Sequence, residues 1–116
     1  MKIGVDIVEK SRIASIIDKF QEKTLRRIFA ENELKRGKEI KNNKLRYGFF
    51  AKRFAAKEAL IKAHGKKLLF KDIEVNNNEY GKPLLYYKKT HIKQAELSLS
   101  DDGDYAIAML ILLTEL

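Results

Sequence analysis

The chain is organised around residues 49–62, where a hydrophobic pattern that starts at Leu45 predicts a long helix. The apolar residues recur at helical spacings of three, four and seven: Leu45, Phe49, Ala56, Leu60 and Ala63. Alanines in this segment favour a helix and allow another element to approach closely. The helix is expected to end at Gly65, because glycine readily takes the left-handed conformation that closes helices.

Alternating residues at the start of the chain predict a strand over 2–8. Ile3, Val5 and Ile7 fall on one face, and Gly4 and Asp6 fall on the other. Aspartate is uncommon in strands, so Asp6 requires an explanation. Either it lies on a solvent face near the strand end, or it has a partner elsewhere in the chain.

A second helical pattern covers Glu9–Lys23, with a core stripe formed by Ile13, Ile17 and Phe20. A different face of this helix carries cations around one aliphatic residue: Arg12, Ile16, Lys19 and Lys23. Such a face is either a docking surface for an acidic partner or an ordinary solvated face.

The remaining segments do not alternate regularly between helix and strand. We expect a polar helix over 30–41, strands over 72–75, 83–87, 97–100 and 105–113, and a short helical piece over 88–95. Turn residues separate the strands at 76–81 and 101–104. This order favours a single domain over 1–116, of α+β class, with a largely antiparallel sheet.

The formal charge of +8 is concentrated in one segment. Residues 35–71 hold 13 of the 24 lysines and arginines and only two acids, Glu39 and Glu58. Such a field favours anionic partners, including phosphates, nucleic acid or an acidic protein. Without cysteine, the chain has neither disulfides nor thiolate metal sites.

Other features of the sequence exclude several classes of protein. The start has an acid after only a few apolar residues, unlike a signal peptide, and the run 105–113 is too short to span a bilayer. We therefore expect a soluble, cytoplasmic protein that does not bind a membrane. Nucleotide-binding glycine loops, the zinc-protease motif and the nucleophile elbow are absent, and His64 and His91 lack metal-ligand spacing.

Glu58 is the one acid within a strongly basic part of the predicted central helix, close to Arg53, Lys57 and Lys62. One interpretation is a solvated ion pair with Lys62 four residues later, which contributes a few tenths of a kcal/mol. The functional interpretation needs a second carboxylate, and Asp6 is available.

Several segments, taken in order, resemble the holo-acyl-carrier-protein synthases, the small type of 4′-phosphopantetheinyl transferase. The most specific are Gly4-Val5-Asp6-Ile7-Val8-Glu9 and Arg53-Phe54-Ala55-Ala56-Lys57-Glu58-Ala59. Further matching segments are Arg12-Ile13, Arg27-Ile28-Phe29, Glu33-Leu34, Lys62-Ala63, Asp72-Ile73-Glu74-Val75, Gly81-Lys82-Pro83, Leu97-Ser98-Leu99-Ser100 and Tyr105-Ala106-Ile107-Ala108. The resemblance covers nearly the whole chain.

This resemblance implies transfer of phosphopantetheine from coenzyme A to a serine of apo-acyl carrier protein, a step of fatty acid biosynthesis, with release of adenosine 3′,5′-bisphosphate. It assigns Asp6 and Glu58 as ligands of a Mg²⁺ ion. A hard cation held by few carboxylates and completed by phosphate and water fits these residue types. Lys62 is expected to add positive charge, and either a metal-bound water or a nearby carboxylate would take the serine proton.

The same resemblance implies the residues that contact coenzyme A and the carrier. The expected coenzyme A contacts are Arg53, Lys57, Lys62, Gly65 and Pro83. It implies a homotrimer with active sites between subunits, and an acidic carrier protein that docks on the first helix through Arg12, Ile16 and Lys19.

The chain departs from the family pattern at two places. Glu96 and Asp101 stand where the family usually has histidine, and Lys66-Lys67 follow Gly65 where Thr-Gly is common. The missing histidines leave open a non-catalytic member of the family. The basic surface of residues 35–71 leaves open a small module that binds nucleic acid. The nucleic-acid module lacks an evident aromatic platform, because Phe49, Phe50 and Phe54 suit a helix core.

Overall fold

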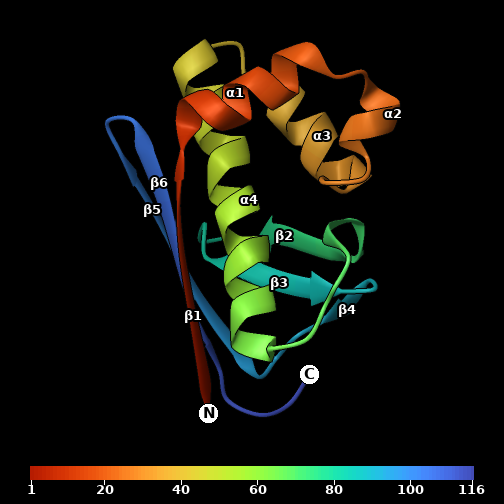
Figure 1. Cartoon of the computed structure of the whole chain (residues 1–116), viewed down its shortest axis with the longest axis vertical. Coiled ribbons are helices and arrows are strands. Elements are labelled where there is room, and N and C mark those ends of the chain that lie inside the picture. The colour runs from red at the N-terminus through yellow and green to blue at the C-terminus, as the bar shows by residue number, and fades with distance from the viewer.

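The computed structural model describes all residues 1–116 and has the predicted α+β architecture (Figure 1). The helices are α1 (Lys10–Lys19), α2 (Glu22–Leu25), α3 (Glu31–Lys38) and α4 (Asn43–His64), with a 3₁₀ turn η1 (Phe70–Asp72). The strands are β1 (Lys2–Glu9), β2 (Ile73–Asn77), β3 (Pro83–Tyr87), β4 (Thr90–His91), β5 (Ala95–Asp102) and β6 (Tyr105–Leu112).

Two antiparallel sheets flank the long helix α4. One has the strand order β1-β6-β5 and the other has the order β2-β3-β4. The first and last strands of the chain are therefore neighbours, with Asp6 opposite Ala108. Helix α4 runs along both sheets, while α1, α2 and α3 gather at one end of the molecule (Figure 1). The predicted antiparallel pairing is confirmed, although it is divided between two sheets.

The ends of α4 follow from local residue chemistry. The side chain of Asn42 accepts a hydrogen bond from the backbone N–H of Leu45 at 3.0 Å, which caps the start of the helix. At the other end Gly65 takes a left-handed φ of 80°, as expected from the sequence. The helix therefore begins at Asn43, just before the predicted apolar stripe, and ends at the predicted glycine.

Small residues allow α4 to lie directly on β1. Gly4 is buried against the helix, and a Cβ added to it would overlap the carbonyl oxygen of Ala59. Ala59 and Ala63, on the facing side of α4, are themselves buried. Farther along the predicted apolar stripe Ala56 and Leu60 are also in the core. Phe49 is half-buried and packs against the core, and only Leu45, in the first turn of the helix, is exposed.

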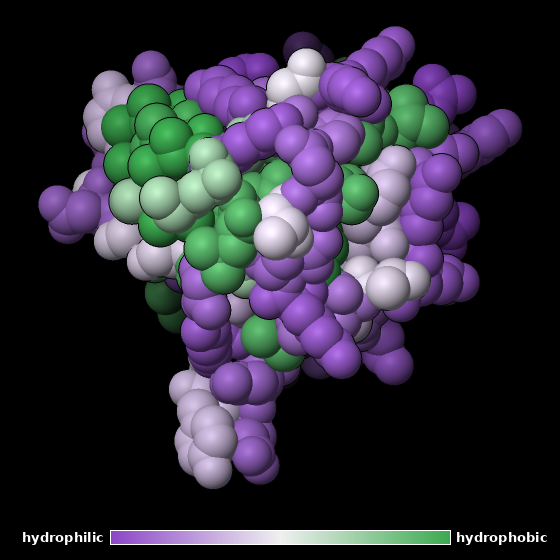
Figure 2. Space-filling model, turned by 90° about the horizontal axis from the view of Figure 1, so that it is seen from below, coloured by the Kyte–Doolittle hydropathy of each residue, from purple (hydrophilic) through white to green (hydrophobic).

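One face of the β1-β6-β5 sheet is apolar and uncovered. Ile3, Val5 and Ile7 point away from α4, with Ile3 64% exposed. Val5 pairs with Met109 and Ile7 pairs with Ile107, and both partners are also exposed. Seen from below, apolar side chains gather in a patch on one side of the molecule (Figure 2). A contiguous apolar face of this kind marks an interaction surface.

Two predicted helices differ from the structure. The expected helix over 9–23 ends at Lys19 and α2 follows as a separate turn, so Phe20 is exposed and does not belong to the core stripe. The expected helical piece over 88–95 is wrong. Lys88 and Lys89 form a two-residue turn with φ of 48° and 67°, and Tyr87 pairs directly with Thr90 of β4.

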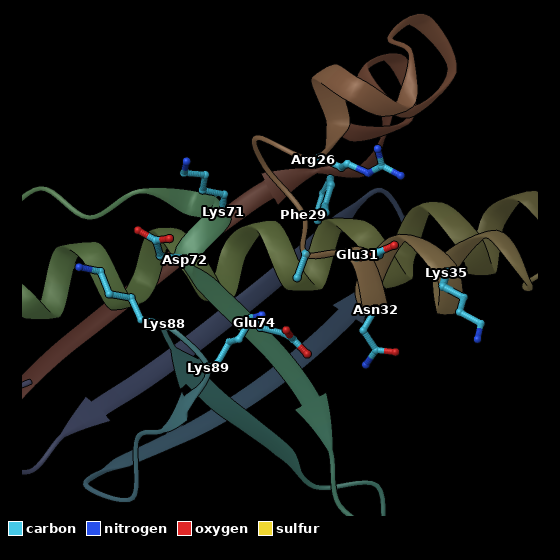
Figure 3. Close-up of a pocket in the computed structure, with 11 residues that line it drawn as sticks. Arg26, Phe29, Glu31, Asn32, Lys35, Lys71, Asp72, Glu74, Lys88 and Lys89 are labelled. Atoms are coloured by element: carbon cyan, nitrogen blue, oxygen red, sulfur yellow. The ribbon is translucent and has the colours of Figure 1, made fainter.

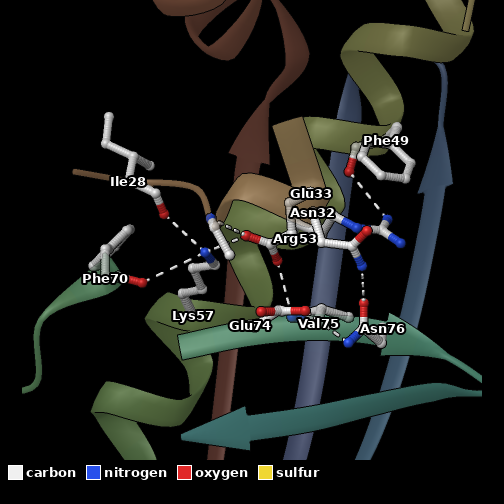
Figure 4. A network of polar contacts seen from close by, with 11 residues as sticks. Ile28, Asn32, Glu33, Phe49, Arg53, Lys57, Phe70, Glu74, Val75 and Asn76 are labelled. Atoms are coloured by element: carbon white, nitrogen blue, oxygen red, sulfur yellow. Dashed lines mark hydrogen bonds and ion pairs between the residues drawn. The ribbon is translucent and has the colours of Figure 1, made fainter. Parts of the chain in front are cut away.

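A buried ion pair joins α4 to α3 and β2 (Figure 4). The ammonium of Lys57 donates to the carboxylate of Glu33 at 2.6 Å, and both side chains are fully buried. Lys57 also donates to the carbonyl of Ile28 at 2.8 Å. Glu33 accepts further bonds from the backbone N–H groups of Ala30 and Val75, each at 2.8 Å. Burial lowers the pKa of Lys57 despite its acidic partner.

None of the helices combines the length and the apolar character that crossing a membrane requires.

Candidate active site

The candidate site begins with an acid and a lysine that β1 and α4 bring together. The ammonium of Lys62 lies 3.2 Å from the Asp6 carboxylate and donates to the carbonyl of Val5 at 3.0 Å. The Asp6 side chain is only 15% exposed, whereas that of Lys62 is more than half exposed. Because α4 lies against Gly4, two residues before Asp6, the close packing of strand and helix sets this contact. The resulting pair has its anion sheltered and its cation accessible.

Glu58 lies one helical turn before Lys62. Residues four apart are neighbours on a helix surface, so Glu58 and Lys62 occupy the same side of α4. Glu58 is half-buried, and its carboxylate takes part in no ion pair or hydrogen bond within the chain. The solvated ion pair with Lys62 is therefore not formed, and Lys62 contacts Asp6 instead.

The donor set at this place fits a magnesium ion. Asp6 and Glu58 supply carboxylate oxygens, which are the ligands that this hard cation prefers. No group of three or more acidic, histidine or cysteine side chains forms a metal cage anywhere in the chain. An ion held here would take at most two protein carboxylates and would keep positions open for phosphate and water, which is the usual arrangement for magnesium.

Arg53 and Pro83 lie in a second place, beside the β2-β3 hairpin. The guanidinium of Arg53 lies 3.5 Å from the centre of the Phe49 ring and donates to the side chain of Asn77 at 2.8 Å. Asn77 is the residue opposite Pro83 in the hairpin. Arg53 is largely buried, its Nε has no hydrogen-bond partner, and burial lowers its pKa to about 10.

The two places are on opposite sides of α4. Arg53 precedes Lys62 by nine residues, which corresponds to roughly half a turn of rotation and roughly 13 Å along the axis. Gly65, exposed just beyond the helix end, belongs with Lys62. One chain therefore does not bring all of the expected coenzyme A contacts together. It presents Asp6, Glu58, Lys62 and Gly65 at one place and Arg53 and Pro83 at another.

Lys57 belongs to neither place. Its ammonium is enclosed by Glu33 and backbone carbonyls, so in this structure it is not available to a phosphate. The helical periodicity of the sequence could have indicated that Lys57 is buried, because it lies between the apolar residues Phe54 and Leu60 at helical spacings. Its acidic partner Glu33 was not singled out, because the two residues are distant in sequence.

The two residues that replace family histidines both form ion pairs. Asp101 accepts from Lys10 at 2.7 Å and from Lys52 at 3.2 Å. The hydrogen bond from Lys10, followed by that from Lys52, lowers the pKa of Asp101 although partial burial opposes this. Glu96 accepts from Lys82 at 2.8 Å, next to Pro83. Each acid is thus paired with a lysine of this chain.

The proposed docking residues lie on α1. Arg12 and Lys19 are exposed, and the guanidinium of Arg12 lies 5.4 Å from the centre of the Phe54 ring. Ile16 is half-buried and packs partly against the core, so it is less exposed than the pattern indicated. Both cations remain accessible to a partner.

Comparisons with known proteins connect this geometry to one family. Residues 2–110 match the model of the 4′-phosphopantetheinyl transferase superfamily. A holo-[acyl-carrier-protein] synthase of Wolbachia sp. subsp. Drosophila simulans is 46% identical, with 95% of each chain covered. That of Ehrlichia chaffeensis is also 46% identical, with 98% of this chain and 97% of the relative covered.

Solved structures agree with these relatives. The holo-(acyl-carrier-protein) synthase of Bacillus anthracis in complex with CoA (3′,5′-ADP) has a TM-score of 0.80 and 39% identity, over 96% of this chain and 94% of that one. The Helicobacter pylori synthase in complex with coenzyme A has a TM-score of 0.77 and 30% identity, over 95% and 98%.

The chain is thus a member of the 4′-phosphopantetheinyl transferase superfamily, with the α+β fold of its solved relatives. Within that superfamily, the relatives that it resembles over nearly its whole length are holo-[acyl-carrier-protein] synthases.

Proposed function

We propose that this chain transfers 4′-phosphopantetheine from coenzyme A to a serine of apo-acyl carrier protein. The observation that carries the proposal is the sheltered Asp6 carboxylate in contact with Lys62, with Glu58 one helical turn before Lys62 on α4, within a chain of this family. The proposal includes a magnesium ion, a homotrimer, a role in fatty acid biosynthesis and a cytoplasmic location.

In the proposed reaction the serine oxygen forms a bond to the phosphorus that carries pantetheine. The bond from that phosphorus to the bridging pyrophosphate oxygen breaks, and adenosine 3′,5′-bisphosphate leaves with the electron pair. The serine proton passes to a base in the site. Phosphoryl transfer of this kind depends mainly on positioning and charge neutralisation.

The residues of the chain divide these tasks. Asp6 and Glu58 would hold the magnesium ion, which supplies positive charge to the pyrophosphate when bound. Lys62, whose side chain is more than half exposed, would contact a phosphate oxygen on the same side of α4. Glu58 has no partner within the chain, so its carboxylate is free to act as a ligand.

The separation of Lys62 from Arg53 supports a site that two subunits share. Because the two side chains leave opposite sides of α4, one subunit would supply Asp6, Glu58 and Lys62, and its neighbour would supply Arg53 and Pro83. The uncovered apolar face of β1 and β6 is the surface on which we place the subunit contact.

Disrupting that face is expected to separate the subunits and slow the reaction. Met109→Asp introduces a charge at the centre of the apolar face, and burying an unpaired charge is costly. Analytical ultracentrifugation should show a shift from trimer to monomer, with a parallel loss of transfer. Leu45→Asp, at an exposed apolar position in the first turn of α4 outside this face, is the matched control. An active monomer would exclude the shared site.

Charge reversal on α1 is expected to weaken binding of the carrier protein and to leave binding of coenzyme A unaffected. Arg12→Glu with Lys19→Glu should raise the KM for the carrier, because exposed charges mainly steer association. The difference from wild type should shrink with added salt, since the Debye length is about 8–10 Å near physiological ionic strength. Steady-state kinetics with each substrate varied in turn provides the measurement. Equal losses for both substrates, or no loss for the carrier, would contradict this role.

Buried aromatic residues favour this proposal over a nucleic-acid module. Phe50 and Phe54 lie in the core, and Phe49 is half-buried and covered by Arg53. Bases in single-stranded nucleic acid stack on exposed aromatic rings, and none of these three phenylalanines offers one.

The proposed activity is tested by incubating the protein with coenzyme A, magnesium and apo-acyl carrier protein. Mass spectrometry of the carrier should show the added phosphopantetheine group, and the addition should require the carrier's serine. An unmodified carrier, with a correctly folded protein, would instead identify a non-catalytic member of the family.

A further inference from the structure

A cleft of about 830 Å³ opens between α3, η1 and the β3-β4 turn (Figure 3). Its size is within the range of small-molecule sites. None of its lining residues belongs to the site proposed for transfer. The side chains that matter here are five cations and three acids: Arg26, Lys35, Lys71, Lys88, Lys89, Glu31, Asp72 and Glu74.

The five cations have no anionic partners within the chain. The ion pairs of the structure all involve other lysines, including Lys10, Lys57 and Lys62. All five cationic residues are exposed at the rim of the cleft. In Figure 3 Lys71 and Lys88 lie on one side, Arg26 and Lys35 lie on the other, and Glu74 lies between them. Asp72 also lies near Lys71 and Lys88, Glu31 lies between Arg26 and Lys35, and Lys89 lies beside Glu74 (Figure 3). Each end of the cleft therefore has two cations and one acid, Lys89 and Glu74 lie in the middle, and cations outnumber acids by five to three.

Two of these cations are held in an unfavourable backbone conformation. Lys88 and Lys89 both have positive φ, at 48° and 67°, in a turn that normally takes Asn-Gly. Side chains other than glycine and asparagine are disfavoured in this conformation. The backbone N–H of Lys88 donates to the carbonyl of Asp72 at 2.7 Å, so the turn is fixed against η1. Strained residues of this kind are a reason to examine a site for function.

The acid in the middle of the cleft is also held in place. The side chain of Asn76 donates to Glu74 at 2.7 Å and accepts from Asn32 at 2.9 Å. A fixed carboxylate would repel an anion placed against it, but it accepts hydrogen bonds from hydroxyl groups. Phe29 is the only aromatic residue of the lining and is 1% exposed, so no ring is available to stack on a nucleobase.

We propose that this cleft binds a small phosphorylated polyol with phosphate groups at both ends, such as a sugar bisphosphate. The two groups of cations would each contact one phosphate, and Glu74 would accept from hydroxyls between them. The inference is independent of the proposed transfer reaction, because it uses none of the residues assigned to it.

The test uses fructose 1,6-bisphosphate as the probe and follows backbone amide signals by NMR. We expect saturable shifts at Asn32, Lys71, Lys88 and Lys89 in the full-length protein. Fructose and inorganic phosphate, at matched ionic strength, should each bind at least tenfold more weakly. Shifts confined to residues near Lys62, or equal affinity for inorganic phosphate, would overturn the proposal.

The variant Lys88→Asn with Lys89→Gly separates charge from fold. It removes two cations and supplies the residues that the turn favours, so the melting temperature should rise while affinity for the bisphosphate falls at least tenfold. Lys93→Gln removes an exposed, unpaired lysine outside the cleft and should leave affinity unchanged. Phosphopantetheine transfer should be unaltered in both variants. Unchanged affinity in the double variant, or an equal loss in Lys93→Gln, would overturn the site.

Discussion

Asp6→Asn and Glu58→Gln are each expected to slow phosphopantetheine transfer by at least about 10²–10³-fold, the typical loss when one electrostatic contact to a transition state is removed. Each change keeps the shape of the side chain and removes the negative charge that would hold the metal. The lost charge matters because Asp6 is sheltered, and water does not replace it easily. Single-turnover assays over a range of magnesium concentrations would measure the effect.

A second readout separates metal binding from other roles. Titration with Mn²⁺, followed by electron paramagnetic resonance, should show weaker binding in both variants without any need for turnover. Glu39→Gln, an acid-to-amide change at an exposed position of the same chain, should behave as wild type. Near wild-type turnover of either site variant at limiting magnesium would refute the shared metal site.

Lys57→Met is expected to lower the free energy of unfolding by about 3–5 kcal/mol, because it leaves the Glu33 carboxylate buried without a cation. This is a large share of the roughly 5–15 kcal/mol that keeps a domain folded. Glu33 also accepts hydrogen bonds from the backbone N–H groups of Ala30 and Val75. The variant should therefore loosen the packing of α3 on β2. Urea unfolding followed by circular dichroism measures the change.

Two further variants test the explanation. Adding Glu33→Gln to Lys57→Met removes the unpaired charge and keeps an acceptor oxygen, so part of the stability should return. Lys44→Met, which removes an exposed lysine without an ion-pair partner from the same helix, should change stability by less than about 0.5 kcal/mol. A loss below about 1 kcal/mol in Lys57→Met would mean that the pair contributes little.

The sequence was most informative where one local rule determined the structure. Alternation placed β1 and β6, and Gly65 marked the end of α4, whereas the start at Asn42 was not predicted. The failure at 88–95 has a physical cause, since two lysines in left-handed conformation form a turn for which lysine carries no signal. The break after Lys19 was missed because the apolar spacing continues to Phe20, although that side chain lies outside the core.

Part of the candidate site could be predicted from the sequence. The part that was missed depends on contacts between segments that are distant in sequence. Resemblance to the family drew attention to Asp6, Glu58 and Lys62, and the structure brings Asp6 and Lys62 into contact. Nothing in the local sequence indicated that Lys57 would pair with Glu33, because the two residues are distant in sequence and meet only in the folded structure. The orientation of Arg53 away from Lys62 follows from helix geometry, but its partner Asn77 does not.

The close packing of α4 on β1 affects how alanine scanning of this protein would be interpreted. At most positions alanine deletes atoms, but at Gly4 it adds a carbon where the backbone of Ala59 leaves no room. The helix would have to move, carrying Lys62 and Glu58 away from Asp6. Such a survey would then count Gly4 among the functional residues, although what it contributes is the absence of a side chain.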